Sequence, residues 1–278
     1  MSPEVLFLAV AFYGFYRYIL PFHPTNKAKH VLQWGGWEAI GVVVFIYYLS
    51  QLVGGISAAI IAALQGKTGA AASQWLQDSA VGQFTIILLI EVVTLSLLYF
   101  FLKRRGASFK TIGFVKRKPT WKDLGYVALG FAAYFFLYVV AINIVKSLIP
   151  GLDLQQEQEV GFETAQGLSL IFVFLSLVIL PPVTEEIVAR GFLYSGLRQQ
   201  FAKPLLAAVV TSVLFGMAHL QAGLGKPLLW VAAIDTFILS MVLIGIRERT
   251  QGHLWAPIGL HMLKNTIAFL TLFVFHAR

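Results

Sequence analysis

The chain has 278 residues, of which 58% are hydrophobic and 12% are charged, and its formal net charge is +8. Soluble globular proteins carry about 25% charged residues. The composition therefore excludes an ordinary soluble domain, a disordered chain and a collagen-like repeat, and it favours a polytopic membrane protein. The positive charge does not indicate a nucleic-acid partner, because most bases lie in short loops between apolar runs. Cysteine is absent, which excludes disulfides and a thiolate nucleophile.

Apolar windows predict an all-α membrane protein with about eight transmembrane helices, since a helix needs roughly 20 apolar residues to cross the hydrocarbon. The windows do not alternate apolar and polar residues as membrane β-strands do. The first window also resembles the apolar core of a signal peptide, but no basic segment precedes it, so a retained helix is favoured. The expected spans are 4–20, 39–64, 81–102, 125–148, 168–187, 204–221, 228–246 and 254–275.

Loop charge predicts the orientation of these helices. The stretch 103–122 holds eight bases and no acid, so the positive-inside rule places it in the cytoplasm, whereas the acidic loop 150–167 fits the other side. Some apolar residues interrupt the basic stretch. They leave two interpretations open, a segment lying in the membrane interface or a plain cytoplasmic loop. These apolar residues are Phe109, Ile112, Phe114 and Trp121.

Three clusters of polar residues interrupt the apolar C-terminal half, where such groups are costly and usually have a function or pair with one another. Residues four apart share a helix face, so Glu186 and Arg190 can form an ion pair. Pro181 and Pro182 predict that the fifth span breaks, with a separate helix beginning near Val183. The clusters occupy 185–190, 215–219 and 261–265.

The three clusters are expected to meet in one pocket formed by the C-terminal helices. Glu185 and His219 each lie 17 positions from Ala202, the expected turn between two antiparallel spans, so both side chains reach the same level. That level is ~25 Å from the turn if both arms are helical. The third cluster follows the next turn, near Thr250, and lies ~15–21 Å from the same face.

Glu, His and Asn side chains together supply the groups that hydrolysis of a peptide bond by water requires. A glutamate beside an imidazole can hold and deprotonate a water. His and Asn can donate hydrogen bonds to the oxyanion that develops, and no covalent nucleophile is needed. Glu and two His could instead hold zinc with an open fourth position. The H-E-x-x-H signature of helical zinc proteases is absent, which favours the metal-free version.

These motifs, in this order, resemble those of the CAAX prenyl protease and bacteriocin-processing (CPBP, or Abi) family. The resemblance covers roughly residues 165–275. It rests on E-E-x-x-x-R-G at 185–191, F-G-M-A-H ending at His219, and L-W-A-P-I leading into H-x-x-x-N at 261–265. Each motif alone is weak, whereas the ordered set on successive apolar helices is specific. One departure is Ala189, where many members have Phe; it loosens the packing without touching the expected catalytic groups.

The resemblance implies an intramembrane endopeptidase that acts near the C-terminus, or in a hydrophobic or lipidated segment, of a peptide or protein substrate, which in this family can be prenylated. Glu185 is then the general base and His219 its partner on the attacking water, while His261 and Asn265 hold the oxyanion. The Glu/Arg pair supports the pocket. No cofactor is required, although the family has also been described as metalloproteases, which keeps zinc as an alternative. The implied catalytic residues are Glu185, Glu186, Arg190, His219, His261 and Asn265, and the implied pocket residue is Phe215.

We expect region 1–163 to hold the N-terminal helices with the basic loop and region 164–278 to be the catalytic helical domain. The expected location is the plasma (cell inner) membrane, with lipids as further partners and no nucleic acid. Other interpretations stay open: hydrogen bonding between helices by the His and Asn residues, and a non-enzymatic immunity or assembly factor. A transporter is disfavoured because the polar residues crowd into one half. Among the remaining membrane charges, Asp235 and Lys264 are expected to pair, and Glu91 has no assigned role.

Overall fold

The computed structural model describes residues 32–154, 156, 161–162, 164–201, 203–220 and 228–275. Every regular element within these residues is a helix, and none of them forms a strand, which confirms the all-α prediction. The predicted first span, 4–20, lies outside the described residues.

The described residues of the N-terminal half form three long helices and one short one. They are α2 (Gly36–Leu64), α3 (Gly69–Asp78), α4 (Ala80–Arg104) and α5 (Trp121–Leu148). The C-terminal half opens with one long helical segment, Gly167–Gln200, in which two turns have π-helical hydrogen bonding. Its parts are η2 (Gly167–Ser169), α6 (Leu170–Phe174), η3 (Leu175–Ile179), α7 (Leu180–Glu185), η4 (Glu186–Leu193) and α8 (Tyr194–Gln200). The elements that follow are α9 (Pro204–Met217), α10 (Trp230–Arg249), α11 (Trp255–Phe269) and η5 (Leu270–Val274).

Six described helices are long and apolar enough to cross a membrane, which supports an integral multi-pass membrane protein. The seventh apolar helix, α9, has only 14 residues. That is shorter than the roughly 20 residues a full crossing needs, so the predicted span 204–221 is not confirmed. The described residues therefore support six of the eight predicted spans.

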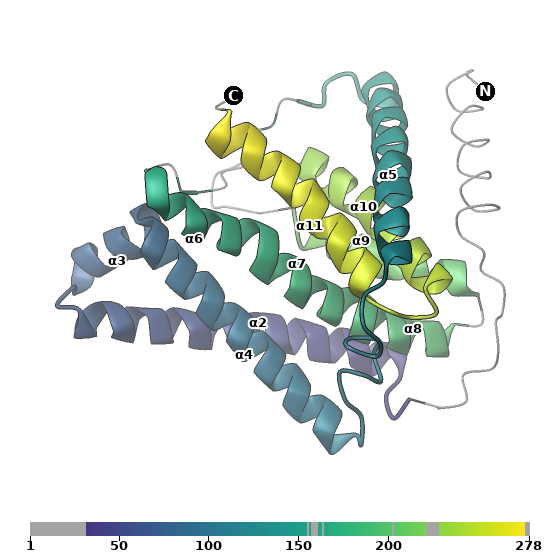
Figure 1. Ribbon diagram of the computed structural model, residues 1–278, viewed down its shortest axis with the longest axis horizontal. Coiled ribbons are helices and arrows are strands. Elements are labelled where there is room, and N and C mark those ends of the chain that lie inside the picture. The colour runs from purple at the N-terminus through teal and green to yellow at the C-terminus, as the bar shows by residue number, and fades with distance from the viewer. Residues whose placement is uncertain are drawn as a thin grey trace.

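The long segment Gly167–Gln200 lies between two groups of helices (Figure 1). Helices α2 and α4 pack along one side of it, and α11 packs along the other. Helices α9 and α10 contact its C-terminal part, and α5 packs on α10 and α11. Gly54 allows α2 to approach α4 closely, since a Cβ there would lie 2.6 Å from Cγ1 of Ile90. Small residues at such crossings are typical of helices that pack in lipid. One apolar core combines residues of both predicted regions, and the boundary near residue 163 stays a prediction.

The helix continues through Pro181 and Pro182, so the predicted break is wrong. The prolines begin α7 directly after the π-helical turn η3, and the backbone stays helical throughout. A proline has no N–H, so the Leu177 carbonyl lacks both its α-helical donor at position 181 and its π-helical donor at position 182. The Asn265 side chain on α11 supplies the missing donor, with Nδ2 2.8 Å from the Leu177 oxygen.

The basic loop and the acidic loop lie at opposite ends of α5, which is 28 residues long and therefore spans ~40 Å. At the basic end, the Leu254 N–H donates to the Gly113 carbonyl and the Trp255 ring N–H donates to the Arg117 carbonyl. The corner between α10 and α11 is thus at the same end as the basic loop. This arrangement fits the positive-inside rule, and the orientation relative to the cytoplasm stays a prediction.

The basic stretch packs against the protein instead of lying wholly in the interface. Ile112 is fully buried, and the Phe114 ring lies 5.9 Å from the Trp255 ring, centroid to centroid. Of the four apolar residues predicted to interrupt this stretch, only Trp121, at the start of α5, is exposed, with 87% of its surface accessible. The structure therefore favours a loop that is docked on the helix ends.

We expect Gly113→Ala to destabilise the protein by about 1–3 kcal/mol. Gly113 has a φ of +99°, and a Cβ there would overlap the Gly252 carbonyl oxygen at the α10–α11 corner. Thermal unfolding of the purified protein in detergent measures the loss. Gly106→Ala is the matched control, because Gly106 also has a positive φ (+63°) but nothing lies within 4 Å of its added Cβ. Equal stability of the two variants would contradict the close docking.

Candidate active site

The predicted ion pair between Glu186 and Arg190 is present and fully buried. Glu186 Oε1 lies 2.8 Å from a terminal nitrogen of Arg190, and both side chains are 0% exposed. The Arg190 guanidinium also lies over the Phe215 ring, 4.1 Å from its centroid. Burial of both charges is tolerable because each has an ionic partner and Arg190 also has an aromatic face. The Phe215 ring also lines the pocket, so it lies between the pocket and the buried ion pair.

His261 lies between two carboxyl groups. Its Nδ1 is 2.9 Å from Glu186 Oε1, and its Nε2 is 3.9 Å from Glu185 Oε2. The first distance is a hydrogen bond, and the second is too long for one. A carboxylate only accepts, so Nδ1 carries the proton and points to Glu186. The imidazole is thereby held with Nε2 directed toward Glu185.

Glu185 and Glu186 have different surroundings although they are consecutive. Successive helical residues point about 100° apart, so Glu186 faces the protein interior while Glu185 faces a pocket. The Glu185 side chain is 31% exposed, against 0% for Glu186. Glu185 is thus the carboxylate of the pair that a substrate can reach.

His219 follows the C-terminal end of α9 and lines the same pocket as Glu185. Its Nδ1 lies 2.8 Å from the Phe215 carbonyl oxygen. A carbonyl only accepts, so Nδ1 carries the proton, and Nε2 of the neutral ring is an acceptor. The shared pocket agrees with the prediction that Glu185 and His219 reach the same level. Within the described residues no hydrogen bond or ion pair joins them directly, so their partnership on a water stays a prediction.

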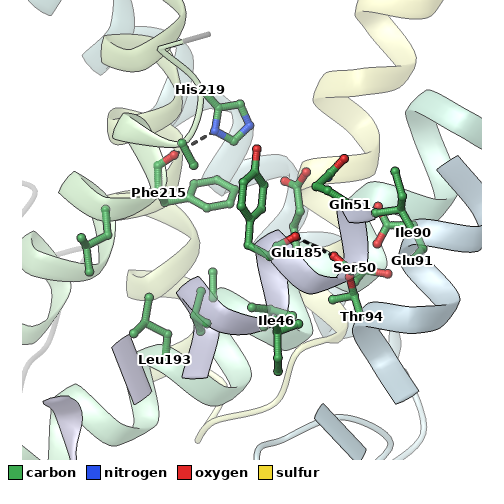
Figure 2. A pocket seen from close by; sticks show the side chains of 17 residues that line it. Ile46, Ser50, Gln51, Ile90, Glu91, Thr94, Glu185, Leu193, Phe215 and His219 are labelled. Carbon is green, nitrogen blue, oxygen red and sulfur yellow. Dashed lines mark hydrogen bonds between the residues drawn. The ribbon is translucent and has the colours of Figure 1, made fainter. Parts of the chain in front are cut away.

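The pocket has a volume of about 310 Å³ and 17 lining residues (Figure 2). In this view Glu185 lies between Phe215 and His219 on one side and Gln51 and Glu91 on the other. Eight lining residues come from α2 and α4, so the C-terminal helices do not form the cavity alone. These eight are Val43, Ile46, Tyr47, Ser50, Gln51, Ile90, Glu91 and Thr94.

Asn265 is not brought into this pocket. One of its amide hydrogens is used by the Leu177 carbonyl, and neither Asn265 nor His261 is among the lining residues. The interpretation that Asn265 forms a hydrogen bond between helices is therefore observed directly, whereas no observation supports its role in holding the oxyanion. The double proline is a sequence signal that could have indicated a carbonyl without a backbone donor, but it was interpreted as a break in the helix.

Sequence reasoning missed the contribution of α2 and α4 to the pocket. Glu91 was a visible signal, as a lone acid in an apolar window, but it received no role. Ser50 and Gln51 gave no signal, since isolated hydroxyl and amide residues are common in membrane helices. The predicted pair of Asp235 and Lys264 is confirmed, with Oδ2 and Nζ 2.6 Å apart, and Tyr134 also donates to Asp235.

The zinc alternative finds no ligand set in the described part of the chain. No three His, Asp or Glu side chains converge there closely enough to hold a metal ion. Such a site needs three or four ligands about 2 Å from the metal. The metal-free version of the reaction stays a prediction.

A known protein family matches the part of the chain that holds this site. Residues 167–267 match the family model described as type II CAAX prenyl endopeptidase Rce1-like. These residues form an Rce1-like domain. The match agrees with the family resemblance seen in the three motifs, and it contains all six implied catalytic residues together with Phe215.

Two curated relatives are similar to the chain. An uncharacterized protein of Bacillus subtilis, YyaK, is 27% identical over 176 residues, which cover 63% of this chain and 54% of the relative. An uncharacterized 24.3 kDa protein of Escherichia coli is 32% identical over 102 residues, which cover 36% of this chain and 44% of the relative. The chain thus spans about half the length of the curated relatives it matches. No solved structure matches it.

Proposed function

We propose that the protein is an intramembrane endopeptidase of the CAAX type. It hydrolyses a peptide bond near the C-terminus, or in a hydrophobic or lipidated segment, of its substrate. The observation that carries this proposal is the position of Glu185, which faces a pocket among membrane-length helices with Nε2 of His261 only 3.9 Å from its carboxylate. The Rce1-like domain at 167–267 supports the same reaction class.

The gap between Glu185 and His261 suits a bridging water. Two groups 3.9 Å apart can each hydrogen-bond one water at ~2.8 Å. In the proposed reaction Glu185 takes a proton from this water, and the water oxygen bonds to the carbonyl carbon of the peptide. The C–N bond then breaks, and Glu185 returns the proton to the leaving amine. Nε2 of His219 is a second acceptor on the pocket wall that can orient the water.

His261 suits the oxyanion role in its protonated form. An imidazolium between Glu186 and Glu185 has a carboxylate partner on each side and can donate from Nε2 to the tetrahedral intermediate. Arg190 and Glu186 keep the ring oriented. We assign Asn265 a positioning role through the Leu177 carbonyl instead of an oxyanion contact.

The apolar walls favour a substrate that enters from lipid. Val43, Ile46, Ile90 and Leu214 line the pocket between helices long enough to span the membrane. A hydrophobic or prenylated segment gains free energy by moving from lipid into such a pocket only if it also satisfies the polar groups there. A peptide bond beside Glu185 does so. The cell inner membrane is the proposed location.

The test is a cleavage assay on the purified full chain in lipid nanodiscs. A peptide with an apolar or prenylated C-terminal segment is incubated with it, and the products are identified by mass spectrometry. We expect two fragments from one internal bond, at a rate unchanged by a chelator of divalent metals. Activity that is lost with chelator and restored by zinc would replace the metal-free mechanism. Tight binding of the peptides with no cleavage would favour the non-enzymatic immunity or assembly factor.

A further inference from the structure

The pocket holds a second carboxyl group that the proposed reaction does not use. Glu91 projects from α4 into the pocket that Glu185 lines (Figure 2). Thr184, the residue directly before Glu185, lines the same pocket. Glu91 lies outside residues 167–267, so the Rce1-like domain does not account for it.

The charges on the pocket wall do not balance. Among the described residues that line the pocket there are two glutamates and no lysine or arginine. Arg190, on the neighbouring turn, is fully buried against Glu186 and the Phe215 ring, so it does not offset them from inside the pocket. Carboxylates at membrane depth are costly unless a cation or a proton accompanies them. An incoming cation would therefore be bound strongly.

The surroundings of Glu91 suit a cation carried on an apolar stem. The Ser50 hydroxyl donates to the Tyr47 carbonyl at 3.0 Å, which leaves its oxygen free to accept. Gln51 lies beside it with an amide oxygen that also accepts (Figure 2). Ile46 and Ile90 line the wall and can cover methylene groups. Lys and Arg side chains have this character, with an apolar stem and a charged end that needs several acceptors.

We propose that Glu91, with Ser50 and Gln51, forms a subsite that binds a Lys or Arg side chain of the substrate close to the bond that is cleaved. This inference rests on the proposed function and deepens it, because it names a substrate feature. Glu185 stays the base, and Glu91 contributes to selection. A substrate segment that is otherwise apolar and carries one basic residue fits the pocket best.

The test measures binding, which does not require turnover. Two hydrophobic peptides with an N-methylated, uncleavable central bond differ only in having lysine or norleucine next to that bond. Fluorescence titration gives their Kd values for the purified full chain in detergent. We expect the lysine peptide to bind about tenfold more tightly than the norleucine peptide, and Glu91→Gln to bring that ratio close to one.

Two further variants keep the test decisive. Glu91→Asp retains the charge and should retain the preference, which separates charge from a folding defect. Glu38→Gln removes a carboxylate that pairs with Arg105 outside the pocket and should leave the ratio unchanged. Equal binding of both peptides to the wild type, or an unchanged preference in Glu91→Gln, would overturn the subsite. A protein that binds with this preference but cleaves nothing would refute the proposed function and leave the subsite standing.

Discussion

Glu185→Gln is expected to lower the rate of peptide cleavage by about 10²–10⁴-fold, the usual contribution of a general base. Glutamine keeps the size and a hydrogen-bonding oxygen of glutamate but cannot take a proton from the water. Glu185 faces the pocket and is 31% exposed, so the change should not impair folding. The rate is measured under single-turnover conditions with the purified variant in nanodiscs.

Glu38→Gln is the matched control for this result. It also replaces one glutamate by its amide, in an exposed pair with Arg105 at the basic end, away from the pocket. It should cleave at the wild-type rate. Full activity in Glu185→Gln would assign the base to another group, and an unchanged cellular phenotype with no activity in either protein would favour the non-enzymatic interpretation.

Arg190→Met is expected to destabilise the folded protein by about 3–5 kcal/mol, the usual cost of removing one partner from a buried ion pair. The variant leaves the Glu186 carboxylate, fully buried, with His261 as its remaining hydrogen-bond partner. It also removes the cation from the Phe215 ring. Reversible unfolding in mixed micelles measures the loss.

A double variant, Glu186→Gln with Arg190→Met, tests the physical origin of that loss. Replacing both members of a buried pair costs much less than replacing one, so the double variant should recover most of the stability. It should not recover activity, since His261 loses the carboxylate that orients it. Arg105→Met, which breaks an exposed pair, should cost at most about 1 kcal/mol. Equal destabilisation by Arg105→Met and Arg190→Met would contradict the dominant role of burial.

The sequence predicted the features that depend on the spacing of residues along one helix, or on the free-energy cost of a charged side chain in lipid. Glu186 and Arg190 pair because they are four apart on one helix, and Asp235 pairs with Lys264 because each would otherwise be a lone charge at membrane depth. The helical architecture followed from the apolar windows in the same way. Glu185 and His219 share a pocket, as expected from their equal distance of 17 positions along the chain from Ala202.

Other features depended on packing that leaves no periodic signal. Helices α2 and α4 are apolar around most of their surface, so the sequence does not indicate which face contacts α7 and η4. The pocket therefore gained Ser50, Gln51 and Glu91 unforeseen. The approach of His261 to both Glu185 and Glu186 likewise depends on how far α11 lies along the long segment, which spacing within one helix does not determine.

The double proline determines how far α11 lies along the long segment. Two smooth apolar helices in lipid have little to prevent one from sliding past the other, but the Leu177 carbonyl can be satisfied only where the Asn265 amide meets it. If α11 shifted by one residue along the long segment, the Leu177 carbonyl oxygen would have no hydrogen-bond donor in the hydrocarbon, at a cost of several kcal/mol. His261 lies one turn before Asn265 on the same face of α11. The hydrogen bond from Asn265 to this unpaired carbonyl thus fixes the position of α11 along the long segment. It thereby fixes the position of the His261 imidazole relative to Glu185 and Glu186.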